Sequence, residues 1–242
     1  MFFYSAILLL SLVSLLSIAR IVSNTMRQNG GVDSHAYWYS GHFLRQRSDP
    51  YGAWRSREQP SLPVDYLDGR SAETLPIAQQ GLSRTPANTM TMVLLLSPLS
   101  FFSWPTAKAL WMAVNLTLII VIPLLTINLL PQPLKKWLIV LICLLFIAMQ
   151  GTRVAAWVGQ TTLLVFALML GALLLLNRGS LLPGLMLGLA LSKFTLSFPV
   201  FLFIAYRRRY RVLAISLLVQ LGGLLLVSLI GQRSPIDVLC DY

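Results

Sequence analysis

The stretch from Asn29 to Tyr51, NGGVDSHAYWYSGHFLRQRSDPY, carries the first acidic residue of the chain, Asp33. After Asp33, one side of a helix would be formed by residues at helical spacing: Ala36, Tyr39, Ser40, Phe43 and Leu44. This pattern predicts a helix over residues 33–47, too short to cross a bilayer, that lies along the membrane interface with its aromatic side chains toward lipid. Asp33 stands at the start of that helix, either as an N-cap or as a carboxylate presented for chemistry.

The rest of the chain has the composition of an integral membrane protein. Of its 242 residues 56% are hydrophobic and 11% are charged, and the mean hydropathy is +0.72. Apolar runs of roughly membrane-spanning length cover residues 3–22, 89–103, 106–130, 137–158, 160–177, 181–204 and 212–230. The first run lacks the positive n-region and the cleavage site of a secretory signal, so we expect it to remain as a helix. The sequence therefore predicts an all-α, polytopic transmembrane helical bundle of about seven spans.

The polar residues divide the chain into four segments. We expect a first transmembrane helix over 1–23, a long loop over 24–88, a transmembrane helical bundle over 89–231 and a short tail over 232–242. The loop holds six of the eight acidic residues and seven arginines, and its five prolines favour short interfacial helices joined by turns.

Basic residues orient the spans. The cluster Arg207, Arg208, Arg209 and Arg211 is expected to be cytoplasmic, which places residues 24–88 outside the cell membrane. A count of single crossings then leaves Lys135, Lys136 and Arg178 on the wrong side. One stretch is therefore expected to be a half-helix or a hairpin, and the sequence Lys193-Phe194-Thr195 followed by Pro199 is the best place for the break.

Three polar side chains interrupt apolar runs. Lys193 lies about midway between Leu181 and Ile204, too far from either interface to reach water easily, so we expect it to face a polar cavity. Gln160 begins one span and Asn115 lies inside another. Each of these amides is either a hydrogen-bonding contact between helices or a ligand-binding group.

Other functional classes have little support. Cys143 and Cys240 are too few for a disulfide framework or a metal site, no cluster of metal ligands is evident, and no nucleic-acid motif occurs. The net charge of +11 is carried along the membrane spans, which suits anionic lipid headgroups or an anionic lipid-linked substrate.

The order of several short motifs resembles glycosyltransferase family 87, over roughly Val32 to Arg211. They are Asp33 after a first span, Tyr37 one turn later, Asp49-Pro50-Tyr51, the stretch from Pro86 to Ser97-Pro98, Ala109-x-Trp111-x-x-x-Asn115, Gly159-Gln160, Gly184 to Lys193, and the closing basic cluster.

The resemblance implies a mannosyltransferase-like membrane enzyme of the C-type fold. Its donor would be a sugar on a polyprenyl phosphate, its acceptor a lipid-linked or cell-envelope glycan, and transfer would invert the anomeric centre without a cofactor. Asp33 matches the position of the catalytic base. Lys193 or Arg84 is suited to meet the charge that develops on the departing phosphate. The remaining candidate substrate-binding residues are Tyr37, Asp49, Tyr51 and Gln160.

Two alternatives stay open. Members of this family are commonly longer, so the chain could be a truncated, non-catalytic subunit or scaffold that binds lipid-linked glycan or a partner protein. A transporter is the poorer alternative because the two halves of the sequence show no internal repeat.

Overall fold

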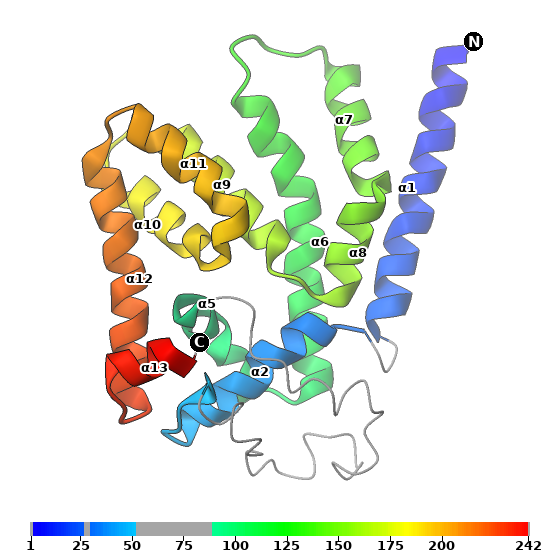
Figure 1. Cartoon of the computed structure of the whole chain (residues 1–242). Helices are drawn as coiled ribbons and strands as arrows, with labels where there is room; N and C mark the ends of the chain where they lie inside the picture. Colours follow the sequence, from blue (N-terminus) through cyan, green and yellow to red (C-terminus); the bar gives the residue numbers. More distant parts are fainter. Residues whose placement is uncertain (1, 27–29, 52–88, 242) are drawn as a thin grey trace.

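The computed structural model describes residues 2–26, 30–51 and 89–241. Every regular element within these ranges is helical, which confirms the predicted all-α transmembrane bundle (Figure 1). The elements are α1 (Phe2–Met26), α2 (Val32–Arg45), α5 (Met90–Leu96), η3 (Ser97–Phe101), α6 (Trp104–Asn128), α7 (Lys136–Ala148), α8 (Gln150–Val158), α9 (Thr162–Leu175), α10 (Leu181–Ala190), η4 (Leu191–Lys193), α11 (Phe194–Tyr206), α12 (Tyr210–Ile230) and α13 (Pro235–Asp241).

Fewer helices than the expected seven are long enough to span a membrane. In the described ranges, length and apolarity select four: Ile7–Met26, Trp104–Asn128, Leu181–Tyr206 and Tyr210–Ile230. The pair α7 and α8 would be a fifth, bent by 57°, because Met149 between them has an extended backbone with ψ 132°. The expected spans at 89–103 and 160–177 are the short apolar helices Met90–Phe101 and Thr162–Leu175.

The segment Leu181–Tyr206, selected above by length and composition alone, is not one straight helix but folds back on itself. A Cβ built on Gly184 would meet Ile215, and one built on Gly188 would meet Val219, so a four-residue advance along α10 matches a four-residue advance along α12. The two helices are therefore parallel, and α11 between them must return in the opposite direction. The turn is η4, where Lys193 leaves helical geometry with ψ 73°. The predicted break at Lys193 is confirmed, and α10 with α11 is a hairpin whose tip carries this lysine.

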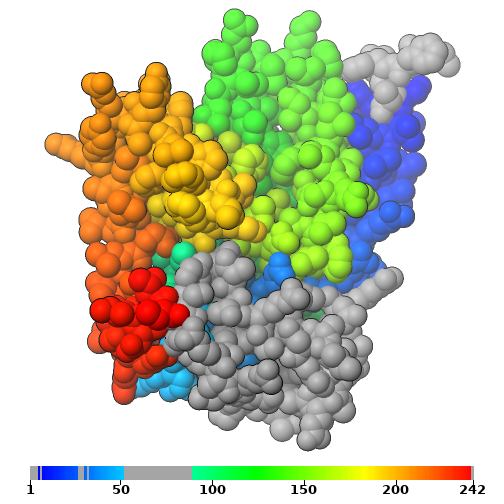
Figure 2. Space-filling view, in the orientation of Figure 1, coloured from blue at the N-terminus to red at the C-terminus, as the bar shows by residue number. Residues whose placement is uncertain are grey.

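The hairpin explains why a count of single crossings placed Lys135, Lys136 and Arg178 on the wrong side of the membrane. The α6–α7 link, which contains Lys135, and the α11–α12 link, which contains Arg208, lie at the upper end of the bundle in Figure 1. Arg209 donates to the Asn177 side chain across 2.9 Å, which joins the α9–α10 link to the same end. The short helix α5 does not add a membrane crossing. It begins beside the hairpin tip, where the Thr89 N–H donates to the carbonyl of Ser192. The basic links are therefore together, and α2 lies at the opposite end of the bundle (Figure 2).

The predicted helix over 33–47 is confirmed as α2, but its aromatic side chains do not face lipid. Trp38 is fully buried, and its indole N–H donates to the Phe102 carbonyl across 3.0 Å. Gly41 permits this packing, since a Cβ there would lie 2.8 Å from the Cβ of Ser100. The helical period was correct, but periodicity identifies an apolar face without showing whether lipid or protein covers it.

Candidate functional site

The first turn of α2 is fixed by glycine rather than by an acidic cap. Gly31 occupies the N-cap position with φ 73°, a left-handed conformation that glycine adopts without steric cost, and no side chain caps the helix. Asp33 is the second residue of the helix proper and is half-buried. The N-cap alternative for Asp33 is therefore wrong. The positive end of the helix dipole still favours a carboxylate at this position.

The junction between α8 and α9 packs directly against this turn. The Gly31 N–H donates to the Trp157 carbonyl, and the Trp111 indole N–H donates to the Gly159 carbonyl, each across 2.9 Å. Gly159 has φ 80°, and a Cβ there would lie 2.5 Å from the hydroxyl of Ser34. The close approach of the two glycines lets α6, α8 and α2 meet, so Asp33 is held by elements far apart in the sequence.

Lys193 reaches the same place from the hairpin tip. Its Nζ donates to the Thr162 hydroxyl across 2.6 Å, and that hydroxyl donates to the Gln160 side chain across 3.1 Å. Gln160 directly follows Gly159, whose Cα lies against Ser34, the residue after Asp33. The lysine therefore has polar neighbours, as expected for a residue that does not face lipid, and three of the predicted site residues converge: Asp33, Gln160 and Lys193.

A second lysine at this site was not among the predicted residues. Lys108, in the first turns of α6, is 6% exposed. Its stem lies against Gly31, since a Cβ there would be 3.1 Å from Lys108 Cδ, and its Nζ lies 5.7 Å from the centre of the Trp104 ring. A lysine inside the apolar run WPTAKALW was the available signal, but basic residues near span ends were attributed to membrane orientation.

Two histidines of α2 stay neutral near this cluster. Burial is the main cause that lowers the pKa of His35 to about 4, and electrostatic repulsion from His42 and then Lys108 lowers it further in the same direction. Burial and the Arg45 guanidinium lower the pKa of His42 to about 4 as well. Both imidazoles pack on tryptophan, with ring centres 4.7 Å apart for His35 and Trp104. Their arrangement supports packing of α2 rather than binding of an anion.

These pKa shifts predict acid sensitivity. Because the folded pKa of about 4 lies below the ordinary value of 6.5, the unfolded chain binds more protons, and stability is lost as the pH falls from 6.5 toward 4. For His35 the loss between pH 6.5 and 5 is about 2 kcal/mol. Melting temperatures of the detergent-solubilised protein should be flat above pH 7 and fall below 6.5. The double variant His35→Asn/His42→Asn should show a smaller fall, and an equal fall would contradict the assignment.

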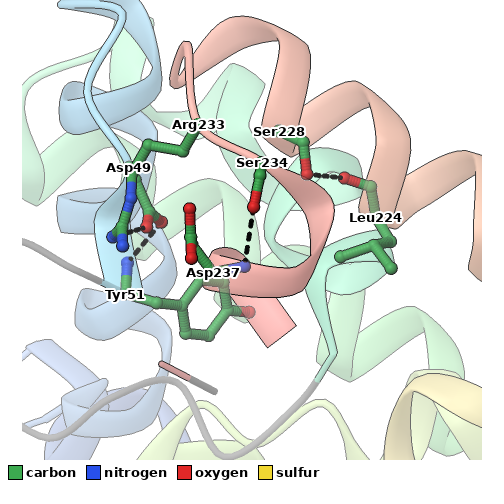
Figure 3. A network of polar contacts seen from close by, with 7 residues as sticks. All are labelled: Asp49, Tyr51, Leu224, Ser228, Arg233, Ser234 and Asp237. Atoms are coloured by element: carbon green, nitrogen blue, oxygen red, sulfur yellow. Dashed lines mark hydrogen bonds and ion pairs between the residues drawn. The ribbon is translucent and has the colours of Figure 1, made fainter. Parts of the chain in front are cut away.

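The predicted residues at the far end of α2 form a separate network with the C-terminal helices (Figure 3). One oxygen of Asp49 accepts the Tyr51 N–H across 2.9 Å, and the other pairs with the Arg233 guanidinium at 2.7 Å. A Cβ on Gly231 would meet Asp49 at 3.2 Å, and Tyr51 is packed in one hydrophobic cluster with Val238. The turn after α2 is thereby tied to α12 and α13.

The remaining residues singled out from the sequence are Tyr37, Arg84 and Asn115. Tyr37 is buried in the same hydrophobic cluster as Tyr51, and Arg84 lies outside the described residues. Asn115 is fully buried in α6, and neither its amide nitrogen nor its oxygen has a hydrogen-bond partner among the described residues. Among the described residues, Asn115 therefore makes no hydrogen bond between helices.

The contacts of Asp49 give a stability prediction. Its carboxylate is almost completely buried while Arg233 is a third exposed, so Arg233→Gln removes a charged partner from a buried carboxylate. We expect a loss of about 2 kcal/mol, and partial recovery in Asp49→Asn/Arg233→Gln. Thermal unfolding of both variants measures this. If Asp49 instead binds substrate, Asp49→Asn should raise KM while leaving the melting temperature unchanged.

Comparisons with known proteins identify the family of the chain. In the described ranges no group of three or more His, Cys, Asp or Glu residues could hold a metal ion. No curated protein and no solved structure matched the chain. The model of glycosyltransferase family 87 matches residues 88–237, which begins after α2 and contains Gln160, Lys193 and the whole hairpin. With this match over more than half of its length, the chain belongs to glycosyltransferase family 87 and is a membrane glycosyltransferase.

Proposed function

We propose that the protein transfers a hexose, mannose-like in kind, from a polyprenyl-phosphate donor to a lipid-linked or cell-envelope acceptor. The observation that carries the proposal is the convergence of two elements: the head of α2, where Ser34 beside Asp33 lies against Gly159, and the hairpin tip, where Lys193 is linked through Thr162 to Gln160. A glycosyl transfer of this kind needs a base on one side of the anomeric carbon and a positive group near the leaving phosphate.

Asp33 is the proposed general base. It takes the proton of the acceptor hydroxyl as that oxygen attacks the anomeric carbon, and the bond from that carbon to the phosphate oxygen breaks. Attack opposite the leaving group inverts the anomeric centre. The phosphate departs with its electron pair, and Lys193 stabilises the charge that develops on it. Thr162 and Gln160 orient the ammonium through the hydrogen-bond chain that links the three side chains.

The depth of Lys193 suits a lipid-linked donor. The ten residues of α10 rise by about 15 Å, roughly half of the bilayer's apolar thickness. The tip of the hairpin can therefore reach a headgroup drawn toward the protein while the prenyl chain stays in lipid. The basic links α6–α7, α9–α10 and α11–α12 lie at one end of the bundle, which is cytoplasmic under the positive-inside rule. The helix α2 and the reaction therefore belong on the extracytoplasmic side of the cell membrane.

A transfer assay tests this proposal. The protein is reconstituted into sealed vesicles, sorted by orientation, and supplied with labelled polyprenyl-phosphate mannose, polyprenyl-phosphate glucose or the matching nucleotide sugars. Membrane extracts provide the acceptor. We expect transfer from a polyprenyl-phosphate sugar and none from a nucleotide sugar. Transfer from nucleotide sugars would overturn the donor class, and no transfer from any donor would favour a non-catalytic scaffold.

A further inference from the structure

We propose that a cleft between α1 and α8 binds the phosphate group of a membrane lipid, at a site separate from Lys193. The cleft has a volume of about 200 Å³. Its polar lining consists of Arg20 and Asn24 from α1 and Gln150 and Arg153 from α8, and Trp157 forms part of its wall. Two guanidinium groups and two carboxamides, with no carboxylate among the described lining residues, match a phosphate chemically.

The guanidinium groups of the cleft have unused donors. Neither Arg20 nor Arg153 is in an ion pair with a carboxylate of the described chain. The Nε of Arg153 is buried and has no hydrogen-bond partner there, an arrangement that costs stability unless an acceptor is supplied. Both Gln150 and Arg153 belong to the first turns of α8, so the positive end of this nine-residue helix adds to the attraction for an anion.

The position of Arg20 favours a lipid as the source of the phosphate. Arg20 is 18 residues beyond Phe2 in a continuous helix, which is about 27 Å and close to the thickness of the bilayer's apolar core. It follows Leu8, Leu12 and Leu16 at four-residue intervals, and all three leucines are at least 53% exposed. An acyl chain can lie along this leucine stripe while its headgroup enters the cleft.

The cleft is also connected to the candidate active site. Trp157 lines the cleft, and its carbonyl accepts the N–H of Gly31, which caps α2 two residues before Asp33. A phosphate held between α1 and α8 would therefore stabilise the junction that holds the head of α2. Neither this site nor its lipid depends on the identity of the sugar donor.

Lipid binding to the purified protein tests the proposal. The probes are phosphatidylglycerol, diacylglycerol with the same acyl chains, and inorganic phosphate, with the melting temperature and native mass spectrometry as readouts. We expect retention of phosphatidylglycerol and a raised melting temperature, and neither effect from diacylglycerol or from inorganic phosphate at the same concentration. Equal effects from diacylglycerol would show that only the chains bind, and equal stabilisation by inorganic phosphate would show an ion site; either result overturns the proposal.

Matched variants locate the site. In Arg20→Gln/Arg153→Gln the affinity for phosphatidylglycerol should fall by about tenfold or more, since each lost contact is a charge-assisted hydrogen bond. Arg207→Gln/Arg211→Gln removes the same charge from exposed positions at the other end of the bundle and should keep the affinity. If the double cleft variant does not fold, Arg20→Gln alone alters an exposed side chain and should still weaken binding. Unchanged affinity in the cleft variants would reject the assignment.

Discussion

Glycosyl transfer should be lost in Asp33→Asn, with a rate lower by something on the order of 10² to 10⁴, the usual contribution of a general base. Asparagine keeps the size of the carboxylate but cannot accept the acceptor's proton. The structure makes this substitution informative, because Gly31 and not Asp33 is the N-cap of α2. The substitution therefore leaves the cap of α2 intact, and the lost interaction of the carboxylate with the helix dipole is worth under about 1 kcal/mol at a partly exposed position.

The control for Asp33→Asn is the same substitution at an exposed carboxylate. Asp237 in α13 is exposed, and Asp237→Asn should leave the transfer rate unchanged. Expression level and melting temperature are compared for both variants, so that a loss of activity is not mistaken for a loss of protein. Undiminished transfer by Asp33→Asn would reject Asp33 as the base.

Lys193→Gln should lower the turnover number by roughly 10² to 10³, the range found when a group that stabilises developing charge is removed. Glutamine keeps a hydrogen-bond donor on a side chain one atom shorter, and the bond from Thr162 to Gln160 does not depend on residue 193, so the main change is the loss of the positive charge. Lys193→Arg keeps the charge and should retain part of the activity. A reduced kcat with a nearly unchanged donor KM is the signature of a charge that acts on the transition state.

A purely structural role for Lys193 makes a different prediction. Loss of packing at the hairpin tip would lower the melting temperature of Lys193→Gln and Lys193→Arg alike, without a selective effect on kcat. Lys135→Gln, which removes an exposed positive charge from the other end of the bundle, serves as the matched control. Full activity in Lys193→Gln would remove this residue from the proposed mechanism.

The features that the sequence predicted correctly depend on local chemistry. The spacing of apolar residues identified α2, the composition identified the membrane bundle, and a charged residue in the middle of an apolar run identified the break at Lys193. The assignment of Gln160 and Lys193 to the substrate site stays a prediction, although the structure links the two side chains through Thr162.

The features that could not be predicted depend on packing between distant segments. Hydropathy measures apolarity but not the direction of a helix, so it did not distinguish the parallel α10 and α12 from two successive crossings. The same limit hid the burial of Trp38 under Phe102, 64 residues later. Asp49 was predicted as a substrate-binding residue from the family resemblance, and its contact with Arg233 could not be predicted because the two residues lie 184 positions apart. Lys108 was not singled out, because its contact with Gly31 is made only in the folded chain.

The hairpin formed by α10 and α11 makes the depth of Lys193 a function of helix length. Both limbs are anchored at the basic end of the bundle, so each residue added to or removed from α10 would move the ammonium by about 1.5 Å and turn it by about 100° around the helix axis. The close contacts of Gly184 and Gly188 with α12 oppose such a shift, since no larger side chain fits at either position in this register. The length of one short helix thus sets the level in the membrane at which a positive charge can meet a lipid-linked phosphate.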